Sequence, residues 1–203
     1  MEESIKNVIS KTFNNGHPFE QKLNAGNCTK EEIQKWLINR YYFEETMVKK
    51  DAIILSKCPN REFRNMWIKR ILDADQPEGG LDCWVKMGLS CDIDVTNESL
   101  LTPGTKFACD AFLAWCQQTD WVEVVSSSLS QLQASLNHQS KTMSWPEMYP
   151  WIDINYFKLR KVQAGMDSER CLKFILESGL SMETINKTAQ LKRNMMKVLL
   201  DSI

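Results

Sequence analysis

The sequence predicts an all-α protein, a bundle of seven to eight helices, from three observations. Apolar residues recur at helical spacing over most of the chain, whereas the alternation that indicates strands is sparse. Only 8 glycines occur in 203 residues, fewer than the average share of about 7% would give. The prolines stand between the periodic segments, at positions 18, 59, 77, 103, 146 and 150. No linker or repeat divides the chain, so we expect a single domain over residues 1–203.

The first predicted helices begin at residues that cap a helix N-terminus. Thr29 opens a capping box, and the helix that follows runs into the late fifties. Asn60 caps a second helix, which ends near Asp75. We expect a loop at residues 76–80 and a short helix at 81–91.

The middle of the chain continues in the same way. A turn at residues 102–104 precedes a helix over 106–118. Asp120 caps a further helix, which we expect to continue to about Asn137. The aromatic, proline-containing stretch at 144–151 is typical of a packed loop between helices.

Three helices are predicted in the last quarter of the chain. They cover residues 153–165, residues 167–178 and the segment from Ser181 to the C-terminus. Gly179 ends the second of them, because glycine adopts the left-handed conformation that follows many helices. Ser181 caps the third.

Composition excludes several functional classes. The 25 basic and 26 acidic residues nearly balance and no segment is strongly basic, so we expect no nucleic-acid partner. No apolar segment resembles a secretory signal or a membrane span, so we expect a cytoplasmic protein without a membrane partner. The seven cysteines are odd in number and form no Cys-x-x-Cys pair, which indicates reduced core side chains.

Four basic side chains fall on helix faces that are otherwise apolar. They are Arg40, Arg70, Arg160 and Lys192. A buried unpaired charge is very costly, so each needs a partner. One explanation is internal ion pairing, with Arg40 and Glu44 one helical turn apart as the obvious pair. The other is a cation-lined cavity for an anionic ligand. The cavity is favoured for the set, because Arg70, Arg160 and Lys192 show no evident acidic partner on their own faces.

Residues for other kinds of chemistry are scarce. The chain has two histidines, His17 and His138, and no Glu-x-x-His motif, so we expect no metal site and no cofactor. The pair Gly79 and Gly80 lacks the lysine and the strand of a phosphate-binding loop. There is no Gly-x-Ser-x-Gly elbow, and no cysteine has a neighbouring histidine.

A series of short motifs follows one order along nearly the whole chain, from about His17 to Asp201. They are residues 39–43, 50–52, 70–73, 101–104, 107–108, 110–112, 127–129, 138–140, 144–146, 149–152 and 156–157. Together they resemble the pyrroloquinoline quinone biosynthesis protein C family. The resemblance implies a haem-oxygenase-like bundle, usually a homodimer. It also implies an oxidase that uses molecular oxygen, without cofactor or metal, to complete a tricyclic tricarboxylate quinone.

The resemblance also implies roles for individual residues. His138, Tyr156 and Arg160 match reactive positions of the family's pocket. The positions implied for substrate binding are Arg40, Glu44, Lys50, Arg70, Lys141 and Lys192. Arginines bind carboxylates through two hydrogen bonds, which suits a polycarboxylated ligand. Lys141 replaces a family arginine and Glu44 a family glutamine.

Other departures from the family fall mostly on groups that transfer protons. Ala74 replaces a histidine expected to act as acid or base. Phe13 and Asn14 replace a tyrosine and histidine, Phe43 and Phe112 replace tyrosines, and Ser130 replaces a threonine. Losing a positioned acid or base costs a factor of about 100 to 10,000 in rate. The sequence therefore favours an enzyme whose oxidation is impaired, with a small anionic aromatic and oxygen as its ligands.

Three alternatives stay open. The first is a non-catalytic or repurposed binding protein of the same fold, in which Glu44 neutralises Arg40. The second is a metal-dependent relative similar to the para-aminobenzoate synthases, for which histidines are few. The third is thiaminase-like hydrolysis by a cysteine, for which no nucleophile is marked.

Overall fold

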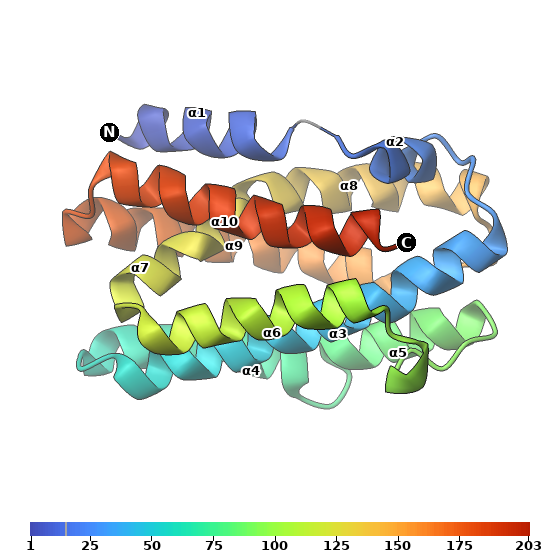
Figure 1. Cartoon of the computed structure of the whole chain (residues 1–203), viewed down its shortest axis with the longest axis horizontal. Helices are drawn as coiled ribbons and strands as arrows, with labels where there is room; N and C mark the ends of the chain where they lie inside the picture. The colour runs from blue at the N-terminus through green and yellow to red at the C-terminus, as the bar shows by residue number, and fades with distance from the viewer. Residues whose placement is uncertain (15) are drawn as a thin grey trace.

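The computed structural model describes residues 1–14 and 16–203, and every regular element in these ranges is a helix (Figure 1). The all-α prediction is thereby confirmed. The elements are α1 (Glu2–Phe13), α2 (Pro18–Asn24), α3 (Lys30–Lys57), α4 (Arg61–Asp75), α5 (Gly80–Ser90), η1 (Glu98–Leu100), α6 (Pro103–Gln118), α7 (Trp121–Ser126), η2 (Ser127–Ser130), α8 (Gln131–Met148), α9 (Asn155–Ser178) and α10 (Met182–Asp201).

The predicted capping residues act as expected. The Thr29 hydroxyl accepts a hydrogen bond from the Glu32 backbone N–H, and the Glu32 carboxylate accepts one from Thr29 N–H. Asn60 caps α4 through the Phe63 N–H at 3.0 Å. Gly179 follows α9 with φ of 72°, in the left-handed region. Each of these caps depends on residues close together in the chain, so the sequence alone was enough to predict it.

The helices before residue 28 were not assigned from sequence. His17 caps α2: its ring nitrogen accepts from Phe19 N–H, and the Glu20 carboxylate accepts from His17 N–H. The usual N-cap residues are serine, threonine, aspartate and asparagine, so a histidine at this position did not predict a helix start. The His17 ring also contacts the Asp201 carboxylate at 2.8 Å, which joins α2 to the end of α10.

The prediction for residues 120–151 was wrong in two respects. The helix expected from Asp120 to about Asn137 is divided into α7, η2 and α8. The loop expected at 144–151 is helical as far as Met148, so α8 includes Pro146. Trp145 explains this continuation, because its side chain is completely buried and packs edge-on against Trp36, with ring centroids 5.8 Å apart.

The prediction of two helices over 153–178 was also wrong, since α9 is continuous. Gly165 lies inside it, where α8 comes close: a Cβ at this position would stand 3.5 Å from Ser135 Oγ. Asp167 therefore lies inside α9 and does not begin a helix. Its buried carboxylate instead approaches arginines of two helices.

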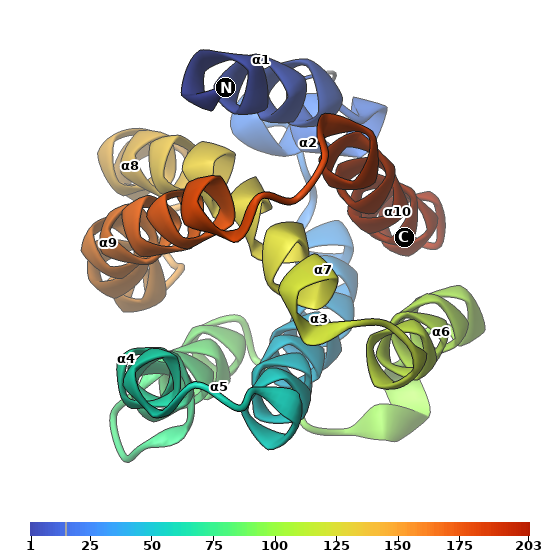
Figure 2. The same cartoon turned by 90° about the vertical axis from the view of Figure 1, so that its left-hand side faces the viewer.

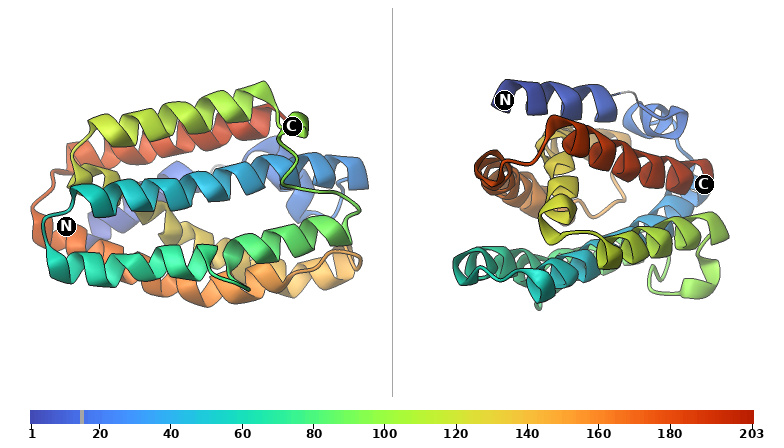
Figure 3. Two further views of the ribbon diagram at one scale, coloured as in Figure 1. Left: turned by 90° about the horizontal axis from the view of Figure 1, so that it is seen from below. Right: turned by 60° about the vertical axis from the view of Figure 1, so that its left-hand side comes forward.

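In the end-on view of Figure 2, α7 lies near the middle and the longer helices are arranged around it. α8 and α9 lie side by side, α3 packs on α4 and α6, and α10 packs on α1 and α6 (Figure 3). All seven cysteines are buried free thiols, as predicted. None of the helices described has the length and apolar character needed to cross a bilayer.

Candidate active site

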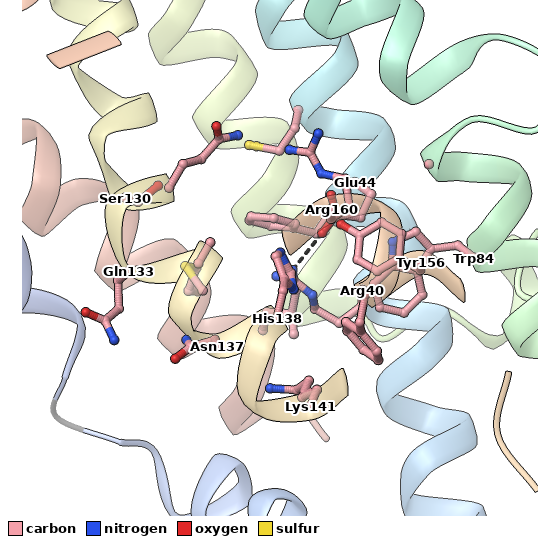
Figure 4. Close-up of a pocket in the computed structure, with 18 of the residues that line it drawn as sticks. Arg40, Glu44, Trp84, Ser130, Gln133, Asn137, His138, Lys141, Tyr156 and Arg160 are labelled. Carbon is pink, nitrogen blue, oxygen red and sulfur yellow. Dashed lines mark hydrogen bonds and ion pairs between the residues drawn. The ribbon is translucent and has the colours of Figure 1, made fainter. Parts of the chain in front are cut away.

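A cavity opens between helices from both halves of the chain. The space open to the centres of water molecules is about 180 Å³, enough for on the order of a dozen waters. Its walls come from α1 to α5, from η2 and α8, and from α9 and α10. Figure 4 shows that polar side chains from α3, α8 and α9 point into it.

The cavity brings together most of the residues predicted for the site. Those lining it are Arg40, Glu44, Arg70, His138, Lys141, Tyr156, Arg160 and Lys192. Lys50 does not line it. This lysine is fully buried behind the cavity wall, where its Nζ contacts Ser128 Oγ at 2.5 Å and Asp51 Oδ1 at 2.9 Å. Among the substituted positions, Phe13, Phe43, Ala74 and Ser130 line the cavity, but Asn14 and Phe112 do not.

Arg40 and Glu44 form the ion pair that their spacing predicted. Arg40 Nη2 lies 2.6 Å from Glu44 Oε1, and the two side chains are 16% and 17% exposed (Figure 4). The Arg40 guanidinium also lies over the Phe43 ring, 4.3 Å from its centroid. The pair is therefore mostly enclosed, and Glu44 offsets the charge that Arg40 brings to the cavity.

Arg70 is held by acidic residues of two other helices. Its Nε lies 3.2 Å from Asp51 Oδ2 of α3, and its Nη1 lies 3.1 Å from Asp167 Oδ2 of α9. Burial tends to raise the pKa of Asp51, but Arg70 and Lys50 together outweigh it and hold that pKa below its usual value. The Asp51 carboxylate therefore stays ionised beside the guanidinium.

Arg160 also has an acidic partner, which corrects the sequence analysis. Its Nη1 lies 3.7 Å from Asp167 Oδ2, two turns further along the same helix. A spacing of seven residues places both on one face. This pair was not predicted, because Asp167 was placed at the start of a separate helix over residues 167–178. The spacing Arg160 to Asp167 was the signal that could have found it.

His138 and Tyr156 stand together as uncharged polar groups. Their rings meet edge to face, with centroids 5.7 Å apart. His138 is 9% exposed, and its Nδ1 has no hydrogen-bond partner in the described structure. Burial, with the positive charges of Arg160, Lys141 and Arg40, lowers the pKa of His138 to about 3. Burial and the Glu44 charge raise the pKa of Tyr156, so the imidazole is neutral and the phenol keeps its proton near pH 7.

The two cavity lysines lack the carboxylate partners that the arginines have. Lys141 Nζ contacts the Asn24 amide oxygen at 3.4 Å, and burial lowers the pKa of Lys141 to about 8. Lys192 lies between the faces of Phe43 and Phe112. Burial and the Lys50 charge place the pKa of Lys192 well below its usual value.

The arrangement combines positively charged groups with apolar walls. Arginines supply directed N–H donors, and aromatic walls such as Trp84 and Phe157 supply apolar contact. No three His, Cys, Asp or Glu side chains within residues 1–14 and 16–203 form a group that could hold a metal ion.

Comparison with known proteins supports a single family. The model of the TENA/THI-4/PQQC family matches residues 2–199. The chain is 42% identical over 170 residues to the pyrroloquinoline-quinone synthase of Ectopseudomonas mendocina (strain ymp), covering 79% of this chain and 68% of that protein. It is 36% identical over 199 residues to the protein of that name from Pseudomonas putida (strain W619), covering 92% of this chain and 79% of the relative.

Solved structures support the fold. A TenA homologue from P. horikoshii OT3 superposes with a TM-score of 0.73 at 16% identity, covering 99% of this chain and 96% of that one. A TenA homologue from Pyrococcus furiosus gives a TM-score of 0.67, also at 16% identity, covering 98% of each chain. These likenesses confirm the haem-oxygenase-like fold that the motifs imply. With its family model matched from residue 2 to residue 199, the chain belongs to the TENA/THI-4/PQQC family.

Proposed function

We propose that this protein acts in pyrroloquinoline quinone biosynthesis and binds a multiply carboxylated aromatic precursor in its internal cavity. The relatives named pyrroloquinoline-quinone synthase, at 36–42% identity, support the pathway. The observation that carries the proposal is the meeting of Arg40, Arg70 and Arg160 at one cavity from three helices. Such a constellation suits a ligand with several carboxylates.

The proposed reaction is an oxidation of the bound precursor by molecular oxygen, at a slow rate. Oxidation of a reduced ring to a quinone releases protons, which need acceptors beside the ligand. The His138 imidazole, with a pKa of about 3, is a weak base, and the phenol of Tyr156 already carries its proton. Ala74 lies on the cavity wall and supplies no acid or base. The residues that the resemblance implies as reactive are thus poor proton acceptors near pH 7, which favours a slow oxidation.

Binding is tested by isothermal titration with pyrroloquinoline quinone. An Arg40→Ala/Arg160→Ala variant loses two charge-assisted contacts of about 1.5–3 kcal/mol each. We expect its Kd to rise by a factor on the order of 10² to 10⁴. Arg61→Ala is the matched control, because Arg61 is an exposed arginine at the start of α4. Unchanged affinity in the double variant, or no binding to the native chain, would rule out the proposed site.

Turnover is tested by single-turnover spectroscopy with the reduced tricyclic precursor and oxygen. We expect quinone to form slowly in the native protein and faster in an Ala74→His variant. Quinone formation as fast as in a relative that keeps the full set of motifs would show that the substitutions do not limit the reaction. The homodimer implied by the resemblance stays a prediction.

A second candidate function is ligand binding without oxidation. The observation that favours it is the ion pair of Arg40 and Glu44 at 2.6 Å. Arg40 is an expected contact for the ligand, and Glu44 already neutralises its charge. In that case an Ala74→His variant would bind the precursor tightly and still form no quinone.

A further inference from the structure

Lys192 is the more deeply buried of the two cavity lysines, and like Lys141 it has no carboxylate beside it. Its side chain is 3% exposed, yet it lines the cavity from α10. Arg70 and Arg160 each contact a carboxylate. In the described structure no carboxylate lies within ion-pair distance of Lys192 Nζ.

The surroundings of the Lys192 amine are soft and apolar. The Nζ lies 4.5 Å from the centroid of Phe43 and 4.6 Å from that of Phe112, and it contacts the sulfur of Met47. Neither phenyl ring has an oxygen that could accept a hydrogen bond from an ammonium group. A thioether sulfur is only a weak acceptor.

The charged groups nearest to Lys192 do not supply a counter-ion. On α3, Glu44 is engaged by Arg40, and Lys50 adds a charge of the same sign. On α6, the thiols of Cys109 and Cys116 are buried, and burial raises their pKa, so both stay protonated and uncharged near pH 7.

These surroundings favour the neutral amine. Two aromatic faces attract an ammonium group, but only modestly. Withdrawal from water disfavours the charged form far more strongly, and the Lys50 charge adds to the effect. A neutral amine is a nucleophile, whereas an ammonium group is not.

We propose that Lys192 Nζ forms a reversible imine with an aldehyde, ketone or quinone carbonyl of an aromatic acid bound in the cavity. The nitrogen lone pair adds to the carbonyl carbon and gives a carbinolamine. The carbonyl oxygen takes up the two protons that the amine nitrogen loses and leaves as water, and a C=N bond forms, with no change in oxidation state overall. The inference rests on one part of the proposed function, namely that the cavity binds an aromatic carboxylate. The arginines hold the carboxylate, and the lysine captures the carbonyl.

The test uses 2-formylbenzoate as the probe, with sodium cyanoborohydride to reduce the imine and peptide mass spectrometry to follow each lysine. At pH 7 only about one in 2,500 molecules of a lysine with the ordinary pKa is neutral. We therefore expect Lys192 to be labelled at least about 100-fold faster than exposed lysines such as Lys173, which is 79% exposed. The labelling rate of Lys173 should rise about tenfold per pH unit between pH 6 and 8, whereas that of Lys192 should rise less steeply, because its pKa is lower.

Two controls make the result specific. Lys192→Met removes the amine, keeps a side chain of similar length, and should abolish the fast labelling. Lys50 is the internal control, because it is as buried as Lys192 but is paired with Asp51, so it should stay unlabelled.

Formaldehyde serves as a second, smaller probe under the same conditions. No fast labelling of Lys192 by either probe would refute the neutral nucleophile. Labelling by formaldehyde alone would refute an aromatic carbonyl as its partner. Titration of the native chain with pyrroloquinoline quinone tests the proposed function separately from this inference. Failure of the native chain to bind it would count against the proposed function, whichever way the labelling turns out.

Discussion

Asp51 stabilises three buried groups at once, so its charge should be among the most important for the stability of the fold. Its Oδ1 contacts Lys50 Nζ at 2.9 Å and accepts a hydrogen bond from Trp67 Nε1 at 3.1 Å, and its Oδ2 contacts Arg70 Nε at 3.2 Å. The Asp51 side chain is 6% exposed. The substitution Asp51→Asn keeps the shape and removes the charge that compensates two enclosed cations.

The expected loss of stability follows from this enclosure. Removing one partner of a buried ion pair costs about 3–5 kcal/mol, because the remaining charge is left without compensation. Folded domains are stable by about 5–15 kcal/mol, so the loss is a large share of the total. With a urea m-value of about 2–3 kcal/mol/M, the unfolding midpoint should fall by about 1–2.5 M.

Urea unfolding followed by circular dichroism measures this shift. Glu2→Gln is the control, because it removes the carboxylate of an ion pair with Lys6 in which both side chains are about half exposed. Exposed pairs of this kind contribute little, so the control should leave the midpoint unchanged. If Asp51→Asn shifts the midpoint no more than Glu2→Gln does, the buried network does not hold these helices together.

The pH dependence of stability gives an independent check. The folded pKa of Asp51 lies below its ordinary value. Its contribution is therefore fully present above the unfolded pKa of about 3.9 and is lost as the pH falls through the folded pKa. The native protein should lose stability more steeply than Asp51→Asn over this acid range. Parallel profiles would mean that Asp51 ionises equally in both states.

Three further predictions follow. Glu44→Gln should tighten binding of anionic aromatics by about tenfold in titration calorimetry, because Arg40 loses its internal partner; equal or weaker binding would contradict this. Affinity for an anion should fall as the pH rises through about 8, where Lys141 loses its charge, and Lys141→Arg should abolish that dependence. Asn60→Ala should cost about 1 kcal/mol and lower the Tm by about 2–4 °C in calorimetry, since the Phe63 N–H loses its cap.

The sequence predicted what short-range chemistry decides. Thr29 and Asn60 mark helix starts through side-chain bonds to residues three positions on, so no tertiary knowledge was needed. Arg40 and Glu44 were found for the same reason. In contrast, the boundaries between 120 and 178 depend on packing, since a buried Trp145 carries the helix through Pro146.

The periodicity of apolar residues could not predict which carboxylates pair with the buried cations. Asp51 and Arg70 are 19 residues apart on different helices, and only the crossing of α3 and α4 brings them together. Asp167 was placed at the start of a separate helix, because the glycine two residues before it suggested a break. Both errors favoured the interpretation that the cations stand without partners. The structure shows that internal pairing and a cation-lined cavity coexist.

The hydrogen bonds already made by the arginines indicate which of them can serve a ligand. An arginine has five N–H donors. Arg70 donates Nε to Asp51 and Nη1 to Gln131 at 2.9 Å, so two of its N–H groups make hydrogen bonds within the chain, and the Asp167 carboxylate lies beside the same Nη1. Arg160 uses Nη1 for Gln163 at 3.0 Å, with Asp167 near the same nitrogen, which leaves Nε and Nη2 for other partners. Arg160 also has the larger exposure of the two side chains, 12% against 6%. Arg70 therefore fits the role of an internal brace that orients the carboxylates, and Arg160 fits the role of the ligand contact.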